Sequence, residues 1–123
     1  LHDVSAFLQP DGHLLGVQVK LETPIHPDEA KRLFQQYQPP SPPLPSSPSP
    51  LFIIREERNR PSPRFDIMAG DGMAISIGRI EACSVMSIKY FVLAHNTIRG
   101  AAGAAIANAE LLHATNLLSQ REL

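Results

Sequence analysis

Residues 84–94 read SVMSIKYFVLA, and residues 98–118 read IRGAAGAAIANAELLHATNLL. The first run alternates, and the second half of it is apolar on both sides, which predicts a central strand buried on both faces. The second run is rich in alanine and predicts a helix, the longest element of the chain. The apolar edge of this helix is expected at Leu111, Leu112, Thr115 and Leu118.

The residues before this pair predict shorter elements. A period of two over 13–21 is typical of a half-buried strand. A helix is expected over about 27–38, because it starts with a proline followed by two acids near the positive helix end. Short β-rich runs over 51–54 and 73–80 predict two more strands.

The run 39–50, PPSPPLPSSPSP, has too few backbone donors for a helix or a sheet and predicts a long, irregular surface loop. An alternative is a ligand for an SH3-type groove, since Pro40 and Pro43 have the required spacing. No basic residue lies close enough to orient such a ligand, so the surface loop is preferred.

The order strand, helix, three strands, helix lacks the regular alternation of a doubly wound sheet. We therefore expect an α+β fold with a mixed, largely antiparallel sheet covered by helices. A length of 123 residues with 43% hydrophobic residues suits one domain over 1–123. The glycine-rich fingerprint of a dinucleotide-binding fold is missing from the sequence, so no nucleotide-binding domain is expected in it.

Composition argues against several partners. The net charge is −1 and the charges are spread along the chain, which gives no reason to expect nucleic acid or an anionic membrane. The chain has no apolar run long enough to span a bilayer and no metal-ligand motif.

Cys83 is the only cysteine and cannot form an internal disulfide, so a reducing, cytoplasmic location is expected. The chain begins with Leu1, from which we expect a missing upstream part.

The junction 95–105, HNTIRGAAGAA, joins the central strand to the final helix. Such a junction is expected to present unpaired N–H groups and the positive helix end to an anionic or amide-bearing ligand. Small residues at Gly100, Gly103, Ala104 and Ala107 would let a flat cofactor or another backbone approach. From these residues alone, tight packing is the preferred explanation.

The run HNTIRGAAGAAIANAELL (95–112) resembles the C-terminal signature of aspartate-semialdehyde dehydrogenases of the fungal and archaeal type. Three more segments match in the same order: DGH (11–13), RPSPRFD (60–66), and GM (72–73) leading to IGRI (77–80). The resemblance implies the C-terminal substrate and dimerisation domain, of the aspartate-semialdehyde dehydrogenase and glyceraldehyde-3-phosphate dehydrogenase-like type, and a homodimer. These enzymes reduce aspartyl phosphate to aspartate semialdehyde with NADPH, on the route to lysine, methionine, threonine and isoleucine.

The resemblance also implies roles for single residues. His13 matches the acid/base histidine, and Asn96, Thr97 and Gly100 match the loop and helix start beside the nicotinamide cofactor. The residues alone allow plainer roles: a histidine that begins a strand, and helix caps at Asn96 and Thr97. For Arg99 an ion pair with a nearby carboxylate is expected. For the segment with Arg60, Arg64 and Asp66, a rigid, ion-paired connection is expected.

Two departures limit the implied function. The nucleophilic cysteine of the family lies in an Asn-Cys-Thr-like context far upstream, whereas Cys83 lies in EACS and is expected to be a buried or half-buried thiol. Ala6 stands where the resemblance implies an arginine that grips the substrate carboxylate. The expectation is a fragment that is inactive alone, that does not bind NADP by itself, and whose substrates are handled only in the parent enzyme. The alternative is a non-catalytic dimerising module.

Overall fold

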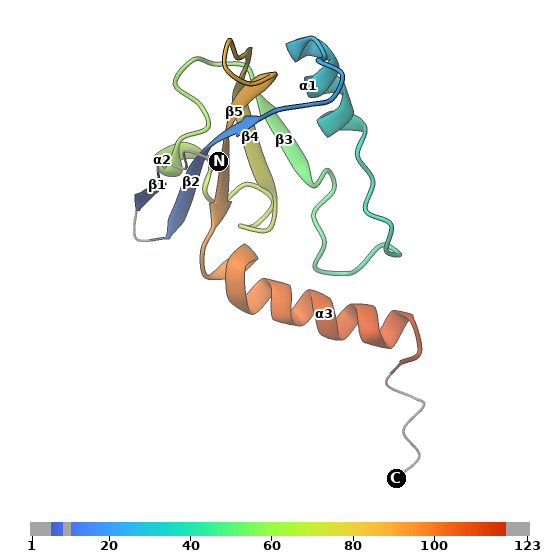
Figure 1. Cartoon of the computed structure of the whole chain (residues 1–123). Coiled ribbons are helices and arrows are strands. Elements are labelled where there is room, and N and C mark those ends of the chain that lie inside the picture. Colours follow the sequence, from blue (N-terminus) through green and yellow to red (C-terminus); the bar gives the residue numbers. More distant parts are fainter. Residues whose placement is uncertain (1–5, 9–10, 118–123) are drawn as a thin grey trace.

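The structure is a computed structural model that describes residues 6–8 and 11–117. It contains a five-stranded sheet of order β1-β2-β5-β4-β3 (Figure 1). β3 and β4 are parallel, and all other neighbours are antiparallel, which confirms the predicted mixed, largely antiparallel α+β fold. The strands are β1 (Ala6–Leu8), β2 (Gly12–Val19), β3 (Phe52–Arg55), β4 (Ile75–Ala82) and β5 (Ile88–His95).

The strand predicted as central, β5, lies in the middle of the sheet, between β2 and β4. It is shorter than predicted, because residues 84–87 form the turn from β4, closed by the N–H of Cys83 donating to the carbonyl of Ser87. β4 likewise begins at Ile75 rather than Met73, since Met73 belongs to a turn that contains Gly70 and Gly72 at positive φ.

The helices are α1 (Pro27–Gln36), α2 (Pro63–Asp66), the π-helix η1 (Ile98–Ala102) and α3 (Gly103–Ala114). α2 is a single turn that periodicity did not predict, because four residues are too few to show a period. The helix predicted over 98–118 starts with the π turn and ends earlier, where Asn116 takes a φ of 57° typical of helix ends. Leu118 lies outside the described residues.

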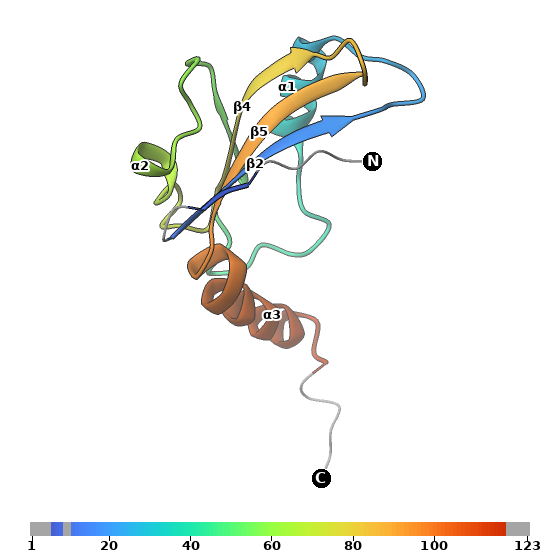
Figure 2. The same cartoon turned by 60° about the vertical axis from the view of Figure 1, so that its left-hand side comes forward.

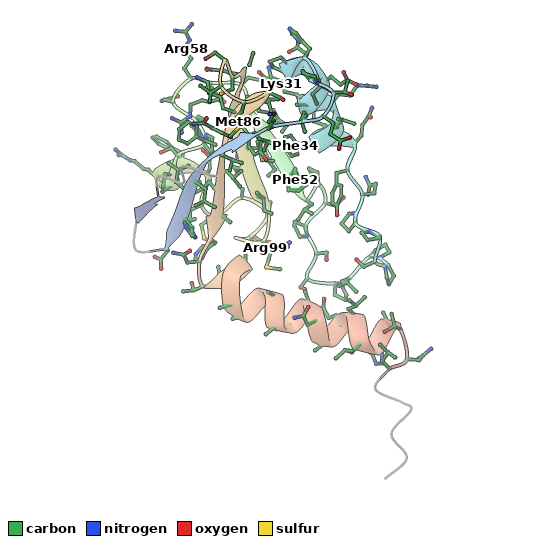
Figure 3. The ribbon with its side chains drawn as sticks, viewed as in Figure 1. Lys31, Phe34, Phe52, Arg58, Met86 and Arg99 are labelled. Carbon is green, nitrogen blue, oxygen red and sulfur yellow. The ribbon has the colours of Figure 1, made fainter. Side chains whose placement is uncertain are left out.

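α1 packs on one face of the sheet, called here the α1 face. Ala30 is buried there with Ile77, Ile80 and Ile88. The ring of Phe34 meets those of Phe52 and Tyr90 edge-on, with centroids 5.6 and 5.3 Å away (Figure 3). Such edge-on aromatic pairs add to the free energy gained by burial, so α1 is held mainly by its apolar stripe.

The opposite face of the sheet carries Phe91, which pairs with Gly16 on β2 and Gly78 on β4. The guanidinium of Arg79 lies 3.6 Å above the Phe91 ring, at the irregularity in β4, and burial lowers the pKa of Arg79. Gly78 has no room for a side chain, because a Cβ there would lie 2.9 Å from Pro61 Cδ. The segment before β4 thus covers part of this face, while the described side chains of β2 remain only half-buried.

α3 extends from the end of β5 away from the sheet instead of lying on it (Figures 1 and 2). Gly103 is its only buried residue, while Ile106 and Leu112 are 56% and 40% exposed. The expected apolar edge of this helix therefore does not pack on the sheet. Two hydrogen bonds join α3 to the 39–50 loop: the backbone N–H and hydroxyl of Ser46 donate to Glu110 Oε2 at 3.1 and 2.7 Å. Among the described residues, no helix is long and apolar enough to cross a membrane.

Candidate functional site

The pairing of β2 with β5 brings two distant candidate segments together. Gly12 is the partner of His95, and His13 is the partner of Ala94. The N–H of Asn96 donates to the carbonyl of Asp11 at 2.9 Å, which joins the turn before β2 to the loop after β5. His13 and the Asn96–Thr97 loop therefore lie at the same end of the sheet.

His13 is half-buried near the start of β2. By strand alternation it shares the α1 face with Val17 and Val19, but α1 packs near the far end of β2 and over β3 and β4. The imidazole is thus neither sealed in the core nor covered by this helix. A half-buried imidazole that α1 does not cover can form a hydrogen bond with a bound molecule.

The loop after β5 is held by His95, which is only 7% exposed. Its Nδ1 accepts the N–H groups of Thr97 at 3.3 Å and Ile98 at 3.2 Å, and it lies 3.3 Å from Thr97 Oγ1. The expectation of unpaired N–H groups at this junction is therefore wrong for Asn96, Thr97 and Ile98. The capping alternative is also wrong for Thr97, whose side chain makes no capping hydrogen bond.

His95 is the side chain of this site that sequence reasoning did not single out. Asn and Thr are usual cap residues, and Asn96 and Thr97 follow His95 directly, so helix capping was predicted for them instead. The available signal was an imidazole at the last position of the strand, three residues before the helix, where a side-chain acceptor can reach the first free N–H groups.

The small residues at the start of the helix have different causes. At Gly103 a Cβ would collide with Met73 Sδ and lie 2.8 Å from the carbonyl oxygen of Ile98, so tight packing explains this glycine. At Gly100 the nearest atom to a Cβ would be the His95 carbonyl oxygen at 3.6 Å, an ordinary contact. Gly100 is exposed on the π turn, and π turns occur often at functional sites. Packing therefore does not explain Gly100.

Arg99 lies between the sheet and α3 (Figure 3). Its Nη1 donates to the carbonyl of Met73 at 3.4 Å. The expected ion pair is replaced by this bond to the turn before β4, which also contacts η1 through Gly72 and Ile98. Arg99 therefore joins η1 to that turn.

The predicted ion-paired connection forms around Asp66, which is 2% exposed. Arg60 donates two N–H groups to the carboxylate, and Arg55 Nε lies 2.9 Å from Oδ1. The N–H of Ser62 donates to Oδ2 at 2.8 Å. Burial opposes ionisation of Asp66, but the hydrogen bonds from Arg60 and Ser62 and the two arginine charges lower its pKa overall. Arg64 does not join this cluster, and its guanidinium lies 5.4 Å from the Phe65 ring centre.

Cys83 lies at the other end of the sheet. Its Sγ is 3.6 Å from Gln18 Oε1, and Gln18 is five residues from His13 along β2, a distance of about 17 Å. The N–H groups of Met86 and Val85 lower the pKa of this half-buried thiol. At that distance Cys83 and His13 cannot exchange a proton directly, so Cys83 does not form a nucleophile pair with His13.

The chain is similar to known proteins over most of its length. A family model described as semialdehyde dehydrogenase, dimerisation domain, matches residues 9–99. An aspartate-semialdehyde dehydrogenase of Archaeoglobus fulgidus is 48% identical over 102 residues, which cover 83% of this chain and 29% of that protein. One from Schizosaccharomyces pombe is 38% identical over 106 residues, which cover 82% of this chain and 30% of that protein.

Solved structures agree with the sequence matches. The crystal structure of aspartate-semialdehyde dehydrogenase with NADP from Candida albicans matches with a TM-score of 0.78 and 33% identity. The match covers 87% of this chain and 31% of that protein. The chain therefore spans less than a third of the length of the relatives that it matches.

Proposed function

Since this chain belongs to the semialdehyde dehydrogenase dimerisation-domain family, we propose that it serves as the C-terminal substrate and dimerisation domain of an NADP-dependent aspartate-semialdehyde dehydrogenase. The reaction would be the reductive dephosphorylation of aspartyl phosphate, on the route to lysine, methionine and threonine. The observation that supports this most is the joining of the turn before His13 to the loop at Asn96 and Thr97.

In this proposal His13 is the acid/base catalyst. It takes a proton from the thiol that attacks the acyl carbon and later returns a proton to the thiohemiacetal oxygen. The thiol comes from a part of the parent that this sequence does not contain, because Cys83 lies at the far end of the sheet. The chain provides one side of the reaction centre only.

Asn96, Thr97 and Gly100 form the cofactor side of the proposed site. Thr97 and Gly100 are exposed, and the open space at Gly100 is compatible with a flat ring approaching the backbone. Bound NADPH would supply the hydride, while the nucleotide-binding domain would hold most of the cofactor. We therefore propose that the isolated chain binds no NADP and has no turnover.

Mixing this chain with the separately produced remainder of the Archaeoglobus fulgidus enzyme tests the function. We expect phosphate-dependent reduction of NADP by aspartate semialdehyde in the mixture and in neither part alone. An inactive mixture in which the two parts are shown to associate would instead favour the second candidate, a non-catalytic dimerising module. Ala6 at the implied arginine position is the observation that favours that candidate.

We also propose a cytoplasmic homodimer, formed through the half-buried face opposite α1, with no nucleic acid or membrane as partner. Leu14 lies on that face by strand alternation and is half-buried, whereas Leu33 on α1 is 52% exposed. Leu14→Lys is expected to weaken the dimer at least about tenfold, because an ammonium group would be desolvated in the interface. Sedimentation equilibrium over a concentration series measures this, with Leu33→Lys as the matched control.

NADPH should leave the dimer mass unchanged, because we propose that the isolated chain does not bind it. A wild-type chain that stays monomeric at all concentrations, or equal weakening by both lysine variants, would rule out this interface.

A further inference from the structure

The imidazole of His95 takes part in no proposed chemical step, yet it is the side chain that holds the proposed cofactor loop. Its Nδ1 accepts two backbone N–H groups, from Thr97 and Ile98, at 3.3 and 3.2 Å. We propose that His95 is a positioning residue: its neutral imidazole holds the loop from Asn96 to Gly100, and protonation of this imidazole releases the loop.

The hydrogen bonds determine which form of the ring is compatible with the loop. A ring nitrogen accepts a hydrogen bond only when it carries no proton, so Nδ1 must be unprotonated and the proton of the neutral ring lies on Nε2. A second proton would go to Nδ1 and point at the N–H groups of Thr97 and Ile98. The two backbone N–H groups would then face the N–H of the ring, which is also a donor, and both hydrogen bonds to Nδ1 would be lost.

The backbone of the turn before β4 packs against one edge of the His95 ring. His95 is 7% exposed, and a Cβ at Gly72 would lie 3.3 Å from His95 Cδ2 and 2.8 Å from Ile98 Cδ1. Gly72 has a φ of +80°, so the backbone of this turn approaches the ring where a side chain would block it. With the ring confined on this side, the loop is the part that moves when the hydrogen bonds break.

Charged and titratable groups occur on each segment packed around His95. The turn before β2 carries a carboxylate and the start of β2 carries the candidate catalytic histidine. The turn before β4 carries a carboxylate, and η1 carries a guanidinium. These residues are Asp11, His13, Asp71 and Arg99. Among the described residues, the His95 ring is the acceptor for the N–H groups of Thr97 and Ile98, so these two amides report on His95 more directly than on its neighbours.

The link between this loop and the cofactor rests on the proposed function, but the holding of the loop by His95 does not. The experiment therefore uses the 123-residue chain without cofactor. Amide hydrogen exchange of Thr97 and Ile98 is measured by NMR between about pH 5 and pH 8, the range in which imidazoles change charge. Rates are corrected for the intrinsic pH dependence of exchange, and wild type is compared with His95→Asn and His95→Leu.

Asparagine is the conservative variant because its side-chain oxygen can accept from the same N–H groups and does not titrate. We expect His95→Leu to lose protection of both amides roughly tenfold at every pH, and His95→Asn to restore it. The wild type should match His95→Asn near pH 8 and lose protection relative to His95→Asn as the pH falls. Equal protection in His95→Leu and wild type would overturn the positioning role. The same pH response in wild type and His95→Asn would overturn the release by protonation. Neither result depends on whether the mixed enzyme is active.

Discussion

Replacing His13 with glutamine is expected to lower kcat of the mixed enzyme about a hundredfold to ten-thousandfold, the usual contribution of a general acid/base. Glutamine keeps a polar side chain of similar size at the start of β2 but cannot carry a proton between two groups. The sheet should be unaffected, because His13 is only half-buried. The Michaelis constant for NADP should change little, since the proposed cofactor residues lie in the loop after β5.

His26→Gln is the matched control. His26 is an exposed imidazole that precedes α1, where its Nδ1 accepts the N–H of Asp28 at 3.3 Å. We expect normal turnover from this variant. If His13→Gln retained full kcat while the mixture was active, another residue would have to carry the proton, and the role proposed for His13 would be wrong.

Replacing Asp66 with asparagine is expected to lower the free energy of unfolding by about 3 kcal/mol, the cost of removing one partner from a buried ion pair. The side chain of Asp66 is fully buried, and the amide would leave the charges of Arg55 and Arg60 without their carboxylate. The low end of the usual range applies because both arginines retain some solvent contact. Urea denaturation near neutral pH measures the change.

Glu81→Gln removes the same charge from an exposed pair. Glu81 lies 3.0 Å from Lys89, and its side chain is 60% exposed, so the expected loss is less than about 1 kcal/mol. If the two variants lost comparable free energy of unfolding, the buried carboxylate would have no special role in stability.

The pH dependence of the Asp66 effect follows from the direction of the pKa shift. The folded protein lowers the pKa of Asp66, so ionisation of this group stabilises the fold above its unfolded pKa, about 3.9. That stabilisation is lost as the pH falls through the folded pKa. The difference between wild type and Asp66→Asn should therefore be constant near neutrality and shrink in acid. A difference that grows in acid would mean that the sign of the shift is wrong.

Local patterns predicted most of the elements and the helix starts at Pro27 and Ile98, but most of the other ends were displaced. The alternation in 84–94 identified the central strand, but residues 84–87 form a turn because the antiparallel return to β4 needs them there. The helix after it was predicted, yet its π start was not, since a π turn depends on how His95 and Met73 confine residues 98–103. The single-turn helix α2 has no periodicity to detect.

The candidate site was predictable only as separate pieces. His13 and the Asn96–Thr97 loop came from motif resemblance, and the sequence contains no sign of the hydrogen bond that joins them. The register of β2 on β5 supplies that link, and register between distant strands is not encoded in either strand alone. The same register explains why Cys83 lies at the far end of the sheet from His13.

The sequence by itself determined the fold class, the central strand, the irregular 39–50 loop and the resemblance to one enzyme family, because these depend on period, propensity and contiguous motifs. Only the tertiary structure decided that His95 caps the loop, that Asp66 is buried between two arginines, and that α3 projects from the sheet. Each of these depends on groups far apart in the chain meeting at fixed distances. Such meetings arise from strand pairing and side-chain packing, which no single stretch of residues specifies.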